Sequence, residues 1–288
     1  MKDDIEIKNL AGMDADTAVE AFEAAFADYS VAFDRRQILA MLERRGFNAQ
    51  LSFGAFSGGR LVAFTYNGVG MYRGVLTSYD CATGTLPGFR GQGLAGAVFR
   101  HGLPFLRAAG IRKCVLEVLK ENAPARAVYE GLGFAVDCEY DCYRQAKEAV
   151  SAPRAACAEV EIRAMDAGML CGLRDWCDFE PSWQNSVESI ERGVAGLTVL
   201  GAYIGDVCVG YCVADSADGD LTQIAVAPSY RRRGVGSALL ASVLPKMASH
   251  SVKMLNVEHG CKPLRAFLDA AGMVQCAGQY GMSRDIAG

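Results

Sequence analysis

Two short glycine-bearing segments, one in each half of the chain, carry the residue types that bind phosphate. They read Leu86-Pro-Gly-Phe-Arg90-Gly-Gln-Gly93-Leu-Ala95 and Ala227-Pro-Ser-Tyr-Arg231-Arg-Arg-Gly234-Val-Gly236. Each follows an apolar run typical of a strand and opens an apolar-periodic run typical of a helix. A strand, a turn with unpaired backbone N–H groups and a helix N-terminus together make a seat for phosphate. The sequence therefore predicts one phosphate-binding module made twice.

The elements that must hold these motifs follow the same order in both halves. Each half opens on a short strand, at 5–8 and 160–163, and a Met-Asp pair follows that suits a helix N-cap. The first half then predicts helices at 17–27 and after Asp34, strands at 50–56, 60–69 and 75–85, a helix at 94–108 and a strand at 113–118. The second half repeats this with strands at 197–204, 207–214 and 221–226, a helix at 235–248 and a strand at 253–257. We expect an α/β (α+β) fold of two domains, each a mixed, mainly antiparallel sheet flanked by helices, with a βαβ crossover at its centre.

Length and composition predict the number of domains and exclude some classes of partner. The chain has 288 residues, and an alanine-rich stretch at 146–158 without a clear period predicts a linker between domains at 1–147 and 158–288. The formal net charge of −4 argues against nucleic acid as a partner, because backbone binding needs a basic face. No uncharged apolar run is long enough to span a bilayer, and the first residues do not read as a signal peptide. We expect a cytoplasmic monomer or homodimer with no nucleic-acid or membrane partner.

The cysteines and histidines do not predict a metal site. The chain has eleven cysteines, none in a C-x-x-C pair, and three histidines, none in a ligand-like cluster. The odd cysteine count and the length favour reduced thiols, which behave as small apolar residues when buried.

At these residues the sequence resembles the GCN5-related N-acetyltransferases. Their signature R/Q-x-x-G-x-G/A matches both glycine segments, and their element N-x-x-A-x-x-x-Y-x-x-x-G-F matches the run from Asn122 to Phe134 at every fixed position. The equivalent run of the second half, from Cys261 to Met273, has cysteine, leucine and leucine in place of asparagine, alanine and tyrosine. The two copies cover nearly the whole chain. The resemblance thus implies a tandem protein with a catalytic N-terminal half and a degenerate C-terminal copy.

The resemblance implies acetyl-CoA as the acyl donor. Its pyrophosphate would lie on the backbone N–H groups from Gly91 to Ala95, at the positive start of a helix. Arg90 would set the turn or add positive charge, and a backbone N–H near Thr83 to Leu86 would polarise the thioester. An isolated glycine motif is also typical of an ordinary strand-to-helix turn. The expected cofactor-binding residues are Thr85, Leu86, Arg90, Gly91, Gln92, Gly93, Leu94, Ala95, Asn122 and Ala125, with Val226, Arg231, Arg232, Arg233, Gly234, Val235 and Gly236 in the second half.

The resemblance also names a general acid, while the base stays open. A tyrosine at the Tyr129 position would protonate the leaving thiolate, with Asn122 seven residues earlier holding the pantetheine arm. The alternative is a core tyrosine bonded to a carbonyl. Asp80, Glu117 and Tyr79 lie on strands near the expected reaction centre, but Asp80 and Tyr79 are adjacent and a regular strand points them to opposite faces. Each candidate base also reads as a structural residue, and water is a further proton carrier.

Residues that follow the first short strand of each half are candidates for the acceptor pocket. Asp28 and Tyr29 in the first half, and Trp176 and Trp183 in the second, fall where the family places its substrate-covering helices. Aromatic rings there would suit a cationic acceptor. An aromatic anchor that packs the two halves together is the competing interpretation.

These expectations combine into one leading function and two alternatives. We expect transfer of an acetyl group to a primary amine of a small molecule or peptide by the N-terminal half. The first alternative is a CoA-sensing or scaffolding protein without turnover. The second assigns catalysis to the C-terminal half, through its tryptophan-rich pocket and Glu258.

Overall fold

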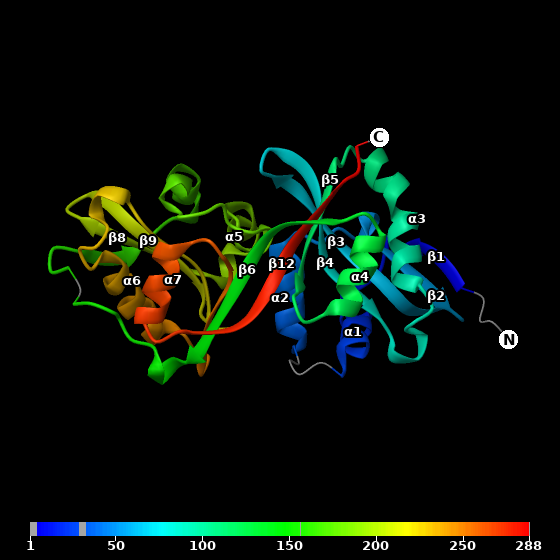
Figure 1. Cartoon of the computed structure of the whole chain (residues 1–288), viewed down its shortest axis with the longest axis horizontal. Helices are drawn as coiled ribbons and strands as arrows, with labels where there is room; N and C mark the ends of the chain where they lie inside the picture. Colours follow the sequence, from blue (N-terminus) through cyan, green and yellow to red (C-terminus); the bar gives the residue numbers. More distant parts are fainter. Residues whose placement is uncertain (1–4, 29–32, 156, 288) are drawn as a thin grey trace. The chain divides into compact units, whose positions relative to one another are not determined.

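A computed structural model describes residues 5–28, 33–155 and 157–287 of the chain (Figure 1). The contacts divide the chain into two compact units. Unit 1 is Met1–Asp137 with Gly281–Gly288, and unit 2 is Cys138–Tyr280. Within the described ranges, no helix combines the length and apolar character that crossing a bilayer requires.

Unit 1 is a sheet covered by helices. Its strands follow the order β1-β2-β3-β4-β5, with the end of β12 beside β5. The strands are β1 (Ile5–Asn9), β2 (Phe53–Ser57), β3 (Arg60–Tyr72), β4 (Val75–Thr85), β5 (Lys113–Leu119) and β12 (Val274–Asp285), and the helices are α1 (Ala15–Phe26), α2 (Arg35–Arg45), α3 (Leu94–Ala108) and α4 (Ala123–Gly131). Neighbouring strands from β1 to β4 are antiparallel, whereas β4 and β5 are parallel and joined through α3.

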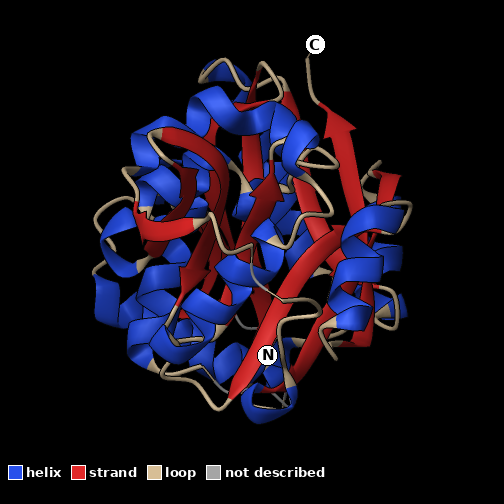
Figure 2. Ribbon diagram, turned by 90° about the vertical axis from the view of Figure 1, so that its left-hand side faces the viewer, coloured by secondary structure: helices blue, strands red, loops and turns tan. Residues whose placement is uncertain are grey.

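Unit 2 repeats this plan. Its strands follow the order β6-β11-β10-β9-β8-β7, with the start of β12 beside β6. The strands are β6 (Ala135–Ala146), β7 (Glu161–Ala164), β8 (Thr198–Ile204), β9 (Val207–Asp215), β10 (Asp220–Val226) and β11 (Ser251–Glu258), and the helices are α5 (Val187–Arg192), α6 (Val235–Val243) and α7 (Lys262–Ala270). Here β10 and β11 form the parallel pair around α6. Figure 2 shows the strands in red with the helices that cover them in blue.

The predicted fold class is confirmed: each unit is a mixed, mostly antiparallel sheet flanked by helices, with one parallel crossover. The helix starts follow the capping residues. Asp14 accepts a hydrogen bond from the Thr17 N–H at 2.8 Å, and Asp34 forms a capping box with Gln37 at the start of α2.

The unit boundaries differ from the ranges 1–147 and 158–288 that the composition predicts. Residues 138–146 of β6 belong to unit 2, because this strand pairs with β11 from Ser251↔Ala146 to Glu258↔Tyr140. The last residues, from Gly281, belong to unit 1, where the Ile286 N–H donates to Arg112 O at 2.8 Å. Which strand pairs with which depends on contacts between residues far apart in the sequence, and amino-acid composition does not predict these contacts.

One predicted helix ends earlier than expected. The helix predicted over 235–248 ends at Val243 and continues as a 3₁₀ turn, Leu244–Lys246, because Pro245 cannot donate the next helical hydrogen bond. The segment between β7 and β8 contains a 3₁₀ stretch, Ala167–Trp176.

Candidate active site

One extra residue in β4 turns two side chains to the same face of the sheet of unit 1. Tyr66 pairs with Ala82 and Asn67 pairs with Asp80, so Cys81 bulges out of the ladder. In a regular strand, residues 80 and 83 would point to opposite faces. The bulge re-aims them, and the Thr83 hydroxyl lies 2.7 Å from Asp80 Oδ2. The strand thereby presents a carboxyl group and a hydroxyl group side by side.

Helix α4 adds a tyrosine to this pair. The Tyr129 hydroxyl donates a hydrogen bond to Asp80 Oδ2 at 2.9 Å. The other carboxyl oxygen, Oδ1, is buried and has no hydrogen-bond partner among the described residues. A buried carboxyl oxygen without a donor is costly, and such groups call for an explanation such as a ligand. Oδ1 therefore keeps unused capacity to accept a hydrogen bond.

The surroundings of Asp80 favour a base that works near neutral pH. Burial raises its pKa to about 6, against the hydrogen bonds from Thr83 and Tyr129 and the positive charge of Arg45, which favour the ionised form. At pH 7 most of the carboxyl is ionised, yet it binds a proton far more readily than an ordinary aspartate. This is the range in which a general base is effective.

Glu117 and Tyr79 form a second buried pair beside the first. The Tyr79 hydroxyl donates to Glu117 Oε2, and the Tyr79 side chain is almost fully buried. Burial raises the pKa of both groups, so Tyr79 stays protonated. Each of the two carboxyl groups thus accepts a hydrogen bond from one tyrosine, Glu117 from Tyr79 and Asp80 from Tyr129, and Asp80 keeps a buried oxygen without a partner.

The glycine turn and α4 enclose a cleft of about 570 Å³ in unit 1. The turn positions its amides through glycine, because Gly91 and Gly93 have φ values of +73° and +74°, and a side chain added at either would point into open space. Gly93 is the N-cap of α3 and has no side chain that could accept hydrogen bonds from the backbone amides of the first turn, so a ligand does not compete with a capping side chain for these amides. From the expected residues the cleft is lined by Thr85, Arg90, Gly91, Gly93, Leu94, Ala95, Asn122, Ala125 and Tyr129.

Unit 2 has a similar cleft of about 470 Å³. Gly234, with φ +87°, is the N-cap of α6, as Gly93 is of α3. Where unit 1 has Gly91, unit 2 has Arg232, which takes the left-handed φ of +65° that glycine usually occupies. From the expected residues this cleft is lined by Val226, Arg231, Arg232, Gly234, Val235 and Gly236.

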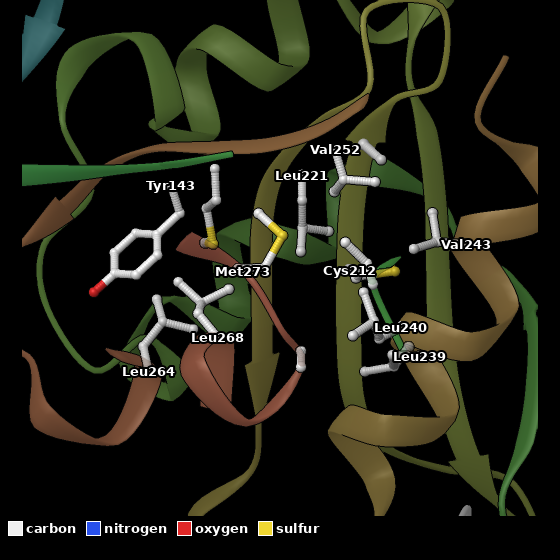
Figure 3. Packing of buried hydrophobic residues seen from close by; sticks show 14 of the residues in the cluster. Tyr143, Cys212, Leu221, Leu239, Leu240, Val243, Val252, Leu264, Leu268 and Met273 are labelled. Atoms are coloured by element: carbon white, nitrogen blue, oxygen red, sulfur yellow. The ribbon is translucent and has the colours of Figure 1, made fainter. Parts of the chain in front are cut away.

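Unit 2 keeps the bulge but has no counterpart of Asp80 or Tyr129. Leu221 pairs with Ala214 and Gln223 with Val213, so Thr222 is the extra residue, as Cys81 is in β4. The residue before the bulge is Leu221 instead of an aspartate, and α7 carries Leu268 at the position of Tyr129. Both leucines are about 1% exposed and belong to the hydrophobic core in Figure 3. Among the described residues, the bulge-side acid and the helix tyrosine occur together only in unit 1.

Comparison with known sequences decides the family. The sequence model of the Acetyltransferase (GNAT) family matches residues 18–134 and 171–273, one region in each unit and more than half of the chain. The chain belongs to the GNAT family. Membership of this family supports acyl transfer, and acetyl transfer in particular, as the general chemistry of the protein.

Solved GNAT structures resemble it over almost its full length. A tandem GNAT protein from the clavulanic acid biosynthesis pathway is 16% identical, with a TM-score of 0.72 over 98% of this chain and 99% of that one. A GCN5-related N-acetyltransferase from Sphaerobacter thermophilus is 15% identical, with a TM-score of 0.71 over 98% and 96%. At this identity the likeness concerns the fold.

Curated relatives are similar over short stretches. A mycothiol acetyltransferase of Corynebacterium glutamicum (strain R) is 50% identical over 48 residues, which cover 17% of this chain and 16% of that protein. One from Beutenbergia cavernae is 43% identical over 70 residues, 21% and 24% of the two chains. The GNAT chain thus matches less than a quarter of the length of each of these relatives.

The arginine of each GNAT motif links the glycine turn to the segment that follows the first strand of its unit. Arg90 donates to Thr85 O at 3.1 Å and Ala25 O at 2.9 Å and pairs with Asp28, and Arg231 makes the corresponding contacts to Val226 O, Trp176 O and Asp178. Hydrogen bonds from Arg90 lower the pKa of Asp28. Asp28 is a proposed acceptor contact, but its carboxylate is paired with this arginine. Its predicted partner Tyr29 lies outside the described residues.

Several other expected contacts are placed differently. Trp183 is 2% exposed, and Trp176 stacks on the ring of Tyr211 with 6.4 Å between ring centroids, so both pack into unit 2 rather than lining its cleft. The Leu86 N–H donates to Val62 O at 2.9 Å, which leaves it unavailable to polarise a thioester. Gln92 and Arg233 are directed elsewhere, toward Gly88 O and the ring of Tyr230.

Sequence reasoning missed two arginines of unit 1. Arg45 ends α2 in the run Glu43-Arg-Arg45-Gly46, which reads as an ordinary basic helix end. Arg100 is exposed and lines the cleft, and its guanidinium folds back so closely that a side chain at Gly96 would lie 3.2 Å from it. The sequence signal that could have found Arg100 is its position four residues after Gly96 in α3. Residues i and i+4 lie on the same face of a helix.

Proposed function

We propose that unit 1 transfers an acetyl group from acetyl-CoA to a primary amine of a small molecule or peptide, with Asp80 as the general base and Tyr129 as the general acid. The observation that carries this is the Asp80 carboxyl, which accepts from Tyr129 on Oδ2 and keeps a buried, unpartnered Oδ1. The curated relatives are named as acetyltransferases, which favours acetyl among acyl groups.

The cleft of unit 1 fits the donor. Its two left-handed glycines keep the α3 amides clear of side chains, so a diphosphate can approach them closely. Asn122 lines the same cleft, and its Oδ1 caps α4 by accepting from the Ala125 N–H at 3.2 Å. Arg100 supplies a positive charge at the cleft wall. When bound, acetyl-CoA would supply an activated thioester carbonyl and a thiolate leaving group.

The two protons of the reaction each have a carrier. Asp80 Oδ1 accepts the proton of the attacking amine as the new C–N bond forms. Tyr129 donates its hydroxyl proton to the departing thiolate as the C–S bond breaks. Because Tyr129 is hydrogen-bonded to Asp80, the carboxylic acid then returns a proton to the phenolate. Both groups finish in their starting protonation states.

Unit 2 suits a binding role without turnover. Its cleft and its glycine N-cap offer the same kind of seat for a diphosphate. Leu221 and Leu268, however, have no proton to give or take, and α7 contains no tyrosine. This argues against the alternative in which the C-terminal half, with Glu258, performs the reaction.

A matched pair of glycine variants tests the assignment to unit 1. Gly93 and Gly234 both have a left-handed φ and each lines the cleft of its own unit, so valine at either position brings a similar backbone strain of about 1–2 kcal/mol and added bulk at the cleft. With a panel of primary amines, we expect Gly93→Val to lower acceptor-dependent thiol release from acetyl-CoA at least tenfold and Gly234→Val to leave it near the wild-type rate. Calorimetric unfolding of both variants checks folding.

Two results would reject the proposal. Loss of activity in Gly234→Val alone would assign catalysis to unit 2. Tight CoA binding by the wild-type protein without thiol release for any amine would favour the CoA-sensing alternative.

A further inference from the structure

Arg45 reaches from the end of α2 to the β4 bulge. Its Nη1 donates to Cys81 O at 2.6 Å, and its guanidinium carbon lies 5.8 Å from the centroid of the Tyr79 ring. Cys81 is the extra residue of the bulge, so this hydrogen bond ties the end of α2 to the bulge itself.

The backbone around Arg45 is seated firmly on β3. Gly46 closes α2 with φ +74°, and its carbonyl accepts from the Val69 N–H at 3.1 Å. Phe47 bridges to Gly68, where a side chain would lie only 1.9 Å from Arg45 O. Gly68 in turn pairs with Tyr79, next to Asp80. The guanidinium therefore starts from a fixed point opposite the bulge.

In unit 2, helix α5 also ends in an arginine, Arg192, whose guanidinium carbon lies 5.3 Å from the centroid of the Trp183 ring. Beside its bulge at Thr222, the Gln223 amide donates to Asn185 O at 2.6 Å. The residue before that bulge is the buried Leu221. The hydrogen bond from Arg45 to the bulge thus lies beside a carboxyl group, whereas the bulge of unit 2 follows a leucine.

Arg45 is also the cation that acts on Asp80 among the described residues. The titratable and polar groups around Asp80 come from four elements: Arg45 from α2, Tyr79, Cys81 and Thr83 from β4, Cys114 and Glu117 from β5, and Tyr129 from α4. Glu117 carries charge of the same sign as Asp80 when ionised, and the negative charge of Asp80 raises the pKa of Glu117.

We propose that Arg45 is a positioning residue for Asp80: its hydrogen bond to Cys81 fixes the bulge that turns the carboxyl toward Tyr129, and its positive charge favours the ionised carboxylate. The kinetic part of this inference rests on the proposed function, whereas the effect on Asp80 itself does not.

The test measures Asp80 directly in the full-length protein. Aspartate is labelled with ¹³C at Cγ, and the Asp80 signal is assigned by its absence in Asp80→Asn. We expect Arg45→Gln to move the titration midpoint of this signal upward from its wild-type position, because an opposite charge has been removed. The acidic limb of the acetyl-transfer rate should move upward with it. The control is Arg36→Gln, an exposed arginine on the same helix, which should leave both in place.

A lysine variant separates charge from geometry. Arg45→Lys keeps the charge but loses the planar fork. We expect the Asp80 midpoint to stay and kcat to fall at least fivefold. An unchanged kcat in Arg45→Lys would contradict the claim that the guanidinium fixes the bulge. If Arg45→Gln does not fold, Arg45→Lys is the variant that tests the role of Arg45.

Other outcomes distinguish this inference from the proposed function. An unmoved Asp80 midpoint in folded Arg45→Gln, or an equal movement in Arg36→Gln, would overturn the role of Arg45. A moved midpoint in a protein whose wild type acetylates no amine would support Arg45 and reject acetyl transfer.

Discussion

Tyr129→Phe is expected to lower kcat for acetyl transfer about 100-fold, the lower range for loss of a general acid. The phenyl ring remains in the cleft, so the KM for acetyl-CoA should change little. The lost hydroxyl also removes a donor to Asp80, 2.9 Å from Oδ2, which raises the pKa of that carboxyl and shifts the acidic limb of the rate profile upward. Steady-state kinetics over pH 5–9 would measure both effects.

The matched control is Tyr72→Phe at the end of β3, outside the cleft. It removes a hydroxyl from unit 1 and should leave kcat unchanged. Equal rates for Tyr129→Phe and the wild type throughout this pH range would remove Tyr129 from the mechanism. Its contact with Asp80 would then be structural.

Asp80→Asn is expected to change how stability depends on pH. The pKa of Asp80 rises on folding from 3.8 to about 6, so its stabilising contribution is full below pH 4 and is lost as pH rises through 6. By that linkage the ionised carboxyl costs the folded wild type about 3 kcal/mol at pH 7 relative to pH 4. Asparagine does not titrate, so the variant escapes this loss.

Urea unfolding at several pH values measures the effect. The free energy of unfolding of Asp80→Asn minus that of the wild type should grow by about 3 kcal/mol from pH 4 to pH 7. Asp137→Asn, which removes an exposed carboxylate of unit 1, is the control and should show no such growth. A constant difference for Asp80→Asn would mean that its carboxyl is not perturbed by burial.

Sequence patterns were informative where function depends on local order. The glycine turns, the caps Asp14 and Asp34, and the span of α3 follow from residue types and short-range periodicity. Asp80 and Tyr129 were each nominated from the sequence, and the structure brings them into one hydrogen bond.

The rest depends on contacts between distant residues. Nothing local marks Cys81 as a bulge, yet this extra residue is what turns Asp80 and Thr83 to one face. Arg45 was missed for the same reason, because it donates a hydrogen bond to Cys81, 36 residues further along the sequence. It also made the tryptophans look like a substrate pocket, because a hydrophobic ring has the same sequence signature in a core as in a cleft.

The central claim is that Asp80 of unit 1 is the base for acetyl transfer, and the pH dependence of kcat/KM for the amine tests it most directly. The amine must be one whose own pKa lies outside the window. For the wild type we predict an acidic limb with an apparent pKa near 6, set by Asp80. In Asp80→Asn we predict that this limb disappears and that the plateau rate falls at least 100-fold. A variant with the wild-type plateau and an unmoved limb would contradict the account.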